Sequence, residues 1–234
     1  MSSKFFTDRF AALTPYTPGE QPQERKYVKL NTNESPFPPS PGVQAAVAEE
    51  ALRLQLYSDP ESANVTRALS ERYGYPADQI LVGNGSDELL NFAFMAYCDE
   101  THPALFADIT YGFYPVFAEI NRVPWIEIPL REDLSIRLSD YTLRDGTVFI
   151  ANPNAPTGLA LCRSEIEAML QARPDRIHVI DEAYVDFGAE SVLPLVERYD
   201  NLLVIQTFSK ARSMAGARLG FAIGQAPLIR DLNT

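Results

Sequence analysis

A lysine placed among hydroxyl residues follows an apolar run near the end of this 234-residue chain. The run is Leu202 to Gln206, and Thr207, Ser209 and Lys210 come directly after it. If the run forms a buried strand, Lys210 lies at its carboxyl end, where open α/β sheets bind their ligands. Burial there lowers the pKa of an amine, as a lysine that forms a Schiff base with a carbonyl group requires. Lys210 is therefore a candidate nucleophile, with an ordinary exposed lysine as the alternative.

Further polar and aromatic residues also stand at the ends of apolar runs. They are Gly85, Ser86 and Asp87 after 80–82, Tyr111 after 104–107, Asn154 after 147–151, Asp181 and Tyr184 after 177–180, and Arg218 just before 219–223. The carboxyl ends of parallel strands meet at one edge of a sheet, so these residues would come together there. Each also has a plainer explanation: Asp181 as a helix cap, Tyr184 as a core aromatic or Arg218 as a surface charge. Their shared position at strand ends favours one binding site instead.

The residue types of this group match the needs of pyridoxal phosphate. Lys210 would bind the cofactor's aldehyde, and a carboxylate such as Asp181 would keep the pyridine nitrogen protonated. Tyr184 and Asn154 can donate hydrogen bonds to the 3-oxygen, and Tyr111 can stack on the ring. The phosphate suits helix N-terminal amides, hydroxyls and a guanidinium, which here belong to Gly85, Ser86, Asp87, Thr207, Ser209 and Arg218. The sequence thus predicts pyridoxal 5'-phosphate as the cofactor.

The elements that position this group are predicted from the hydrophobic pattern. Seven apolar runs, at 80–82, 104–107, 123–128, 147–151, 177–180, 202–206 and 219–223, are expected to be strands. Helices are expected at 41–56, 64–73, 89–97, 110–120 and 164–171, the last with Ser164 as its N-cap. This alternation predicts an α/β fold with three layers, a mostly parallel seven-stranded sheet with helices on both faces. The last strand follows Lys210 too closely for a crossover helix, so it can pair antiparallel.

Two parts of the chain differ in composition. Prolines interrupt residues 1–42, which are predicted to form an extended arm. Such an arm docks either on its own globular part or on a neighbouring subunit, with a plain proline-rich linker as the alternative. Residues 43–234 are expected to form the cofactor-binding large domain.

Overall composition excludes several classes of partner. The net charge of -11 and the pI near 4.7 argue against a nucleic-acid binder. Two cysteines and two histidines indicate neither a disulfide framework nor a zinc site, so no metal is expected. No run reaches the ~18 apolar residues of a membrane helix, and residues 1–10 lack a signal-peptide pattern. We therefore expect a cytoplasmic protein without membrane or nucleic-acid partners.

Segments along nearly the whole chain resemble the histidinol-phosphate aminotransferases, which are fold-type-I pyridoxal-phosphate enzymes of aminotransferase class I/II. The segments are Lys-Leu-Asn-Thr-Asn-Glu-Ser-Pro at 29–36, Gly-Asn-Gly-Ser-Asp-Glu at 83–88, Asn-Pro-Asn-Ala-Pro-Thr-Gly at 152–158, Asp-Glu-Ala-Tyr-Val-Asp-Phe at 181–187, Ser-Lys-Ala at 209–211 and Gly-Ala-Arg-Leu-Gly at 216–220. The lysine and aspartate segments are typical of the superfamily, and the arm segment favours this subgroup.

The resemblance implies an activity and a set of roles. Members transfer an amino group between L-histidinol phosphate and 2-oxoglutarate in histidine biosynthesis. Lys210 would bind the cofactor and move the proton between the substrate's α-carbon and the cofactor, while Asp181 would pair with the pyridinium. Tyr57 is similar to the tyrosine that reaches the cofactor phosphate of the neighbouring subunit in a homodimer. Tyr16 and Asn33, on the arm, would lie near the substrate.

Two departures from the family pattern keep alternatives open. Many relatives read Asn-Asn-Pro-Thr-Gly, whereas Ala155 stands second here, so Asn154 is chosen as the partner of the 3-oxygen. The chain ends at Thr234, where family members continue into a C-terminal small domain, so that domain is expected to be absent. Another pyridoxal-phosphate reaction, such as decarboxylation of a phosphorylated amino acid, and an inactive cofactor-binding fragment remain alternatives. A nucleotide-binding domain is disfavoured because residues 83–88 lack the third glycine of the dinucleotide motif.

Overall fold

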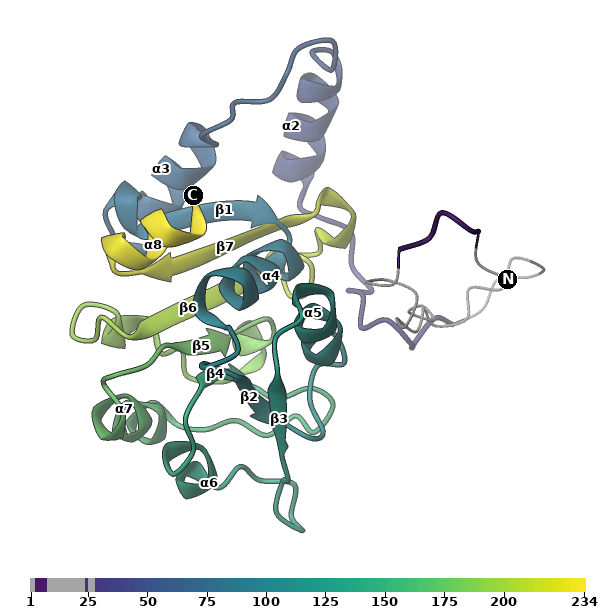
Figure 1. Ribbon diagram of the computed structural model, residues 1–234. Coiled ribbons are helices and arrows are strands. Elements are labelled where there is room, and N and C mark those ends of the chain that lie inside the picture. Colours follow the sequence, from purple (N-terminus) through teal and green to yellow (C-terminus); the bar gives the residue numbers. More distant parts are fainter. Residues whose placement is uncertain (1–2, 8–23, 25–27) are drawn as a thin grey trace.

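A twisted sheet of seven strands forms the centre of the molecule in the computed structural model, which describes residues 3–7, 24 and 28–234 (Figure 1). The strand order is β1-β7-β6-β5-β4-β2-β3. The strands are β1 (Ile80–Asn84), β2 (Ala104–Ala107), β3 (Trp125–Ile128), β4 (Thr147–Ala151), β5 (His178–Asp181), β6 (Leu202–Thr207) and β7 (Leu219–Gly224). The predicted seven-stranded sheet is therefore confirmed, and each strand lies within two residues of its expected bounds.

The pairing directions also follow the prediction. β2, β3, β4, β5 and β6 pair in parallel, and β7 pairs antiparallel with both β1 and β6. The connection from β6 to β7 is too short for a crossover helix, which forces the antiparallel direction. All residues of β4, β5 and β6 are buried, which explains why these strands read as continuous apolar runs.

Helices cover both faces of the sheet. The helices of the described chain are α2 (Pro41–Ala51), α3 (Ala63–Tyr73), α4 (Ser86–Tyr97), α5 (Tyr114–Asn121), α6 (Leu138–Thr142), α7 (Arg163–Ala172) and α8 (Ala226–Leu232). All of them except α2 contribute buried residues. One hydrophobic core lies between the sheet and α4, α5 and α8, and the other lies between the opposite face and α3, α6 and α7. The molecule thus has the three expected layers. Within the described residues, none of these helices combines the length and apolar character needed to cross a bilayer.

Four helix boundaries differ from expectation. α4 begins at Ser86 rather than at residue 89. The helix expected at 41–56 ends at Ala51, and none of its residues is buried, so its apolar pattern does not face the core. The N-cap of α7 is Cys162 rather than Ser164, because Glu165 accepts a hydrogen bond from the Cys162 amide at 2.8 Å and completes a capping box. α5 begins at Tyr114 rather than at residue 110, with a proline in its first turn.

The described part of the arm, residues 28–40, contains neither helix nor strand. It nevertheless contacts the globular part: the Ser213 hydroxyl donates a hydrogen bond to the Ser35 hydroxyl at 2.8 Å. This segment docks on its own chain, which is one of the two arrangements expected for the arm. The division into an arm and a large domain stays a prediction.

Candidate active site

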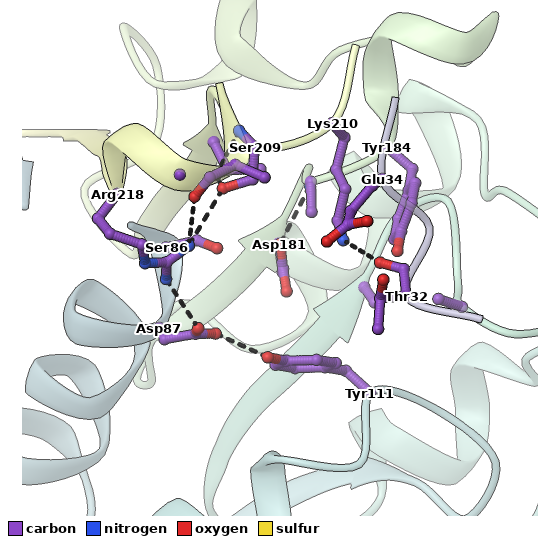
Figure 2. A pocket seen from close by; sticks show the side chains of 16 residues that line it. Thr32, Glu34, Ser86, Asp87, Tyr111, Asp181, Tyr184, Ser209, Lys210 and Arg218 are labelled. Carbon is purple, nitrogen blue, oxygen red and sulfur yellow. Dashed lines mark hydrogen bonds and ion pairs between the residues drawn. The ribbon is translucent and has the colours of Figure 1, made fainter. Parts of the chain in front are cut away.

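A cavity of about 360 Å³ opens at the carboxyl edge of the parallel strands. It gathers nine of the residues predicted from the sequence: Ser86, Asp87, Tyr111, Asp181, Tyr184, Thr207, Ser209, Lys210 and Arg218. Figure 2 shows Asp181 between Lys210 and Tyr184 on one side and Ser209 and Arg218 on the other. Residues from five separate segments thus converge, as a sheet edge with parallel strands requires.

Lys210 reaches into this cavity from the loop that follows β6. Its Nζ donates a hydrogen bond to the Thr32 carbonyl oxygen at 3.4 Å and lies 5.5 Å from the centre of the Tyr184 ring. The Tyr184 hydroxyl in turn accepts a hydrogen bond from the Asn33 side-chain amide at 3.0 Å. Thr32 and Asn33 of the arm therefore hold the Lys210 and Tyr184 side chains on this side of the cavity.

Asp181 is the last residue of β5 and has 4% of its surface exposed. Its Oδ1 accepts a hydrogen bond from the Ala183 amide at 3.0 Å, and its Oδ2 accepts one from the Tyr114 hydroxyl at 3.1 Å. Burial raises the pKa of the Asp181 carboxyl to about 6, against its usual 3.8, although both hydrogen bonds oppose this rise. A buried carboxylate of this kind gains stability when a cationic group binds beside it.

The opposite side of the cavity suits an anion. The first amides of α4, those of Ser86 and Asp87, have no partner within the helix, and the helix dipole adds positive potential at this end. The Arg218 guanidinium joins them, with Nη1 donating to the Ser209 hydroxyl at 3.5 Å and Nη2 lying 3.3 Å from the Asp87 carboxylate. The Thr207 hydroxyl donates to the Ser209 hydroxyl at 3.0 Å. These groups have the chemistry of a phosphate site.

Two glycines let these parts approach each other. Gly85 has φ of 80°, and a Cβ there would lie 2.6 Å from Nη2 of Arg218. A Cβ on Gly220 of β7 would lie 2.5 Å from the carbonyl carbon of Gly85 and 2.6 Å from the Ser86 amide nitrogen. Only glycine avoids these overlaps, so the Gly-x-Gly segment and Gly220 together shape the anion site.

Tyr111 forms a side wall of the cavity. Its hydroxyl donates a hydrogen bond to the Asp87 carboxylate at 2.7 Å, which fixes the ring across the anion site. The ring can therefore offer a flat aromatic face, as the sequence predicted.

Two predicted site residues, Asn154 and Tyr57, are not brought to this cavity. Gly85 and Asn33 do not line it either, but they lie against Arg218 and Tyr184, which do. The Asn154 amide nitrogen donates to the Ile109 carbonyl at 2.9 Å, and its amide oxygen accepts from the Thr110 hydroxyl at 2.7 Å. Its side chain thus ties the loop after β4 to the loop after β2, and Ala155 lines the cavity instead. Tyr57 is fully exposed, outside the cavity of its own chain. Tyr16 lies outside the described residues.

Besides Ala151, Ala155, Ala215 and Gly216 of the cavity lining, sequence reasoning missed four residues of the site. Thr32 and Glu34 line the cavity from the arm, Ala183 lines it next to Asp181, and Tyr114 holds Asp181 from behind. The spacing of Tyr114, three residues after Tyr111, was the one available signal, because such spacing places two side chains on neighbouring faces of a helical turn. Thr32 and Glu34 lie in the arm segment 29–36 that carries the family resemblance, but no local pattern placed them in the cavity, since their positions depend on docking.

Comparisons with known proteins agree with this geometry. The family model "Aminotransferase class I and II" matches residues 25–234. "Histidinol-phosphate aminotransferase 1" of Bradyrhizobium diazoefficiens is 51% identical over 230 residues, which are 98% of this chain and 66% of that protein. "Histidinol-phosphate aminotransferase" of Marinomonas sp. is 52% identical over 232 residues, again 98% of this chain and 66% of the relative. The chain thus spans slightly less than two thirds of the length of these relatives.

A solved structure shares the fold. Histidinol-phosphate aminotransferase from Sinorhizobium meliloti, in complex with pyridoxal-5'-phosphate, superimposes with a TM-score of 0.88 at 24% sequence identity, over 99% of this chain and 66% of that one. The extent of the family match, together with the lysine, the aspartate and the anion site at one sheet edge, shows that this chain belongs to the class I and II aminotransferase family.

Proposed function

We propose that this chain is a pyridoxal-phosphate-dependent aminotransferase that moves an amino group between L-histidinol phosphate and 2-oxoglutarate. The observation that carries the proposal is the single cavity in which Lys210, the buried Asp181 and an anion site meet. Relatives at 51% and 52% identity carry the name histidinol-phosphate aminotransferase, which supports the choice of reaction within the family.

The donor set of the cavity fits the cofactor. Asp181 is buried and its pKa is raised, so a protonated ring nitrogen beside it would relieve the cost of its charge. The α4 amides, Ser209 and Arg218 together offer donors and positive charge to a phosphate. The close approach at Gly85 and Gly220 leaves the backbone bare where the phosphate would bind. Bound there, pyridoxal phosphate would supply an electron sink for the negative charge that forms at the substrate α-carbon.

Each residue then has one physical task. Lys210 would hold the cofactor covalently and afterwards move the proton of the substrate α-carbon. Asp181 would hold a proton on the ring nitrogen, and Tyr184 would donate a hydrogen bond to the ring oxygen. Tyr111 would stack on the ring and exclude water from one face. Asn154 stays a prediction for the ring oxygen, although its amide is engaged with Ile109 and Thr110.

A homodimer is the second part of the proposal. The segment that follows α2 exposes Leu52, Leu54 and Leu56 by 80%, 81% and 63%, and Tyr57 completely. Figure 1 shows α2 projecting beyond the layered core. An apolar segment of this kind gains free energy when a second copy covers it, and a two-fold axis would bring Tyr57 toward the partner's cavity. The cytoplasmic location, inferred from composition, stays a prediction.

Sedimentation of matched variants tests the dimer. Leu54→Ser should shift the chain toward monomer, whereas Leu143→Ser, which changes another leucine that is 83% exposed, should leave it dimeric. A monomeric unsubstituted chain that still binds the cofactor fully would contradict this part of the proposal.

Cofactor binding tests the central claim. Pyridoxal phosphate added to the chain should give a visible absorbance band that borohydride removes, and mass spectrometry should find the reduced cofactor on Lys210. Lys4→Ala, which removes an exposed lysine, should behave like the unsubstituted chain, and Lys210→Ala should lose the adduct. A reducible adduct retained in Lys210→Ala would refute the assignment.

Turnover assays separate the alternatives. We expect amino transfer from L-histidinol phosphate that depends on 2-oxoglutarate. Carbon dioxide release from a phosphorylated amino acid would indicate a decarboxylase, and cofactor binding without turnover would indicate a cofactor-binding fragment. Calorimetry that finds tight binding of NAD or ATP, and none of pyridoxal phosphate, would defeat the proposal.

A further inference from the structure

Tyr114 lies behind the floor of the cavity, at the first position of α5. None of its surface is exposed, and it does not line the cavity. Its hydroxyl donates a hydrogen bond to Oδ2 of Asp181, 67 residues later in the chain, at 3.1 Å. The Tyr114 hydroxyl thus reaches the candidate site at the Asp181 carboxylate.

The position of the Tyr114 hydroxyl is fixed by the packing of its ring. Four aromatic rings surround it, with centroid distances of 5.6 Å to Phe106, 5.6 Å to Tyr111, 6.0 Å to Phe149 and 6.4 Å to Phe94. A closely packed ring has no alternative rotamer to adopt, so its hydroxyl stays aimed at β5. Such packing orients the partner carboxylate as well.

The hydroxyl can act only as a donor toward the carboxylate. Burial, and next the neighbouring Asp181 charge, raise the pKa of Tyr114 well above its usual value, so the phenol stays protonated. The hydrogen bonds from the Ala183 amide and from Tyr114 lower the pKa of Asp181, against the larger effect of burial. Asp87 raises the pKa of Asp181 and Lys210 lowers it. The adjacent buried Glu182 and the phenols of Tyr111 and Tyr141 are the further titratable groups nearby.

We propose that Tyr114 is a positioning residue of the reaction, whose hydroxyl keeps the Asp181 carboxylate ionised and aimed at the ring nitrogen of pyridoxal phosphate at neutral pH. This role rests on the proposed function. It differs from a packing role, because packing affects stability alone whereas this hydrogen bond also sets the pH at which Asp181 loses its charge.

Tyr141 provides a matched control. It is 1% exposed, it packs in the core on the other face of the sheet, and its hydroxyl has no hydrogen-bond partner within the part of the chain that the structure describes. Removing either phenol oxygen therefore leaves a buried ring in place, but only Tyr114→Phe changes the surroundings of Asp181.

The test is the pH dependence of cofactor binding by the full chain. Pyridoxal phosphate is titrated into each protein between pH 5 and 8, and the visible band reports the affinity. We expect the affinity for pyridoxal phosphate to fall in acid as Asp181 takes up a proton. In Asp181→Asn the part of this pH dependence that comes from Asp181 should be absent. The acid midpoint is the pH at which half of this loss of affinity has occurred. Tyr114→Phe should move the acid midpoint upward by about one pH unit, since a hydrogen bond to a charged group is lost. In the pH range where the affinity falls, Tyr114→Phe should bind the cofactor about tenfold more weakly. Tyr141→Phe should move neither value.

A second variant covers the case in which Tyr114→Phe does not fold, as judged by circular dichroism. Site-specific 3-fluorotyrosine at position 114 keeps the ring and makes the hydroxyl a stronger donor, so the acid midpoint should move downward. An unchanged acid midpoint in the folded Tyr114 variants, or an equal shift in Tyr141→Phe, would overturn the role proposed for Tyr114 and leave the proposed function standing. An unsubstituted chain that fails to bind pyridoxal phosphate would overturn the proposed function and this role with it.

Discussion

Replacing Asp181 with asparagine should stabilise the cofactor-free chain at neutral pH. The carboxylate is buried, and its pKa in the folded chain is about 6 against 3.8 for an unperturbed aspartate. The difference of about two pH units means that the charged carboxylate lowers the unfolding free energy by about 3 kcal/mol. Asparagine avoids this cost and keeps the hydrogen bond from the Ala183 amide to its oxygen, while the bond with Tyr114 reverses, since the asparagine nitrogen donates to the Tyr114 hydroxyl.

The effect should depend on pH in a defined direction. Between pH 3.8 and about 6 the folded chain holds a proton on Asp181 that the unfolded chain releases. The stability that this proton contributes is therefore fully present below pH 3.8 and is lost as the pH rises through 6. The advantage of Asp181→Asn should accordingly be near zero at pH 4 and reach about 3 kcal/mol at pH 7 and above.

Urea unfolding of the cofactor-free proteins, repeated from pH 4 to 8, measures this advantage. Asp200→Asn, which changes an exposed aspartate in the turn before β6, is the control and should differ from the unsubstituted chain by less than about 0.5 kcal/mol. If Asp181→Asn is no more stable at pH 7 to 8, or if its gain is the same at every pH, the burial cost assigned to Asp181 is wrong. Pyridoxal phosphate should raise the unfolding free energy of the unsubstituted chain, and it should raise that of Asp181→Asn much less.

Two further predictions concern other buried positions. His178 is 1% exposed and neither ring nitrogen has a hydrogen-bond partner among the described residues; burial, and next Arg176, lower its pKa to about 3. The unfolded chain therefore takes up this proton first as the pH falls below 6.5, and urea midpoints of His178→Leu should fall less steeply in acid than those of the unsubstituted chain. Gly220→Ala should destabilise the fold by about 2 kcal/mol and weaken pyridoxal phosphate binding, because the new methyl group overlaps the Gly85 backbone. Gly216→Ala, with no atom within 4 Å of the added carbon, is its control, and equal urea midpoints for the two alanine variants would contradict the reasoning.

The sheet could be predicted because a strand that is buried on both faces has a recognisable local sequence pattern. Most side chains of β4, β5 and β6 are apolar because both faces of these strands are buried, so a nearly continuous apolar run marks each strand. The site followed from the sheet, since Asp181 and Lys210 each stand at a strand end whose direction was known. Strand ends are placed by topology, and topology could be inferred from run lengths and spacing.

Helix surroundings could not be predicted in the same way. The 3.6-residue pattern of α2 resembles that of a packed helix, yet none of its residues is buried, because a pattern does not record which surface covers it. Asn154 and Ala155 show the same difficulty within one loop. They are neighbours, and only the backbone path, with the Gly158 amide donating to the Asn154 carbonyl at 2.7 Å, decides that Ala155 lines the cavity.

Tyr114 joins the chemistry of the site to the energetics of the fold. In sequence it reads as a core aromatic, and its burial agrees with that reading. The same burial keeps its hydroxyl protonated, and the acceptor to which it donates is the one carboxylate whose charge the proposed reaction needs. The free energy spent in burying Asp181 is recovered only when a cation binds beside it, so cofactor affinity and the instability of the empty chain share one cause. A change that relieves that instability, such as Asp181→Asn, must therefore weaken cofactor binding as well.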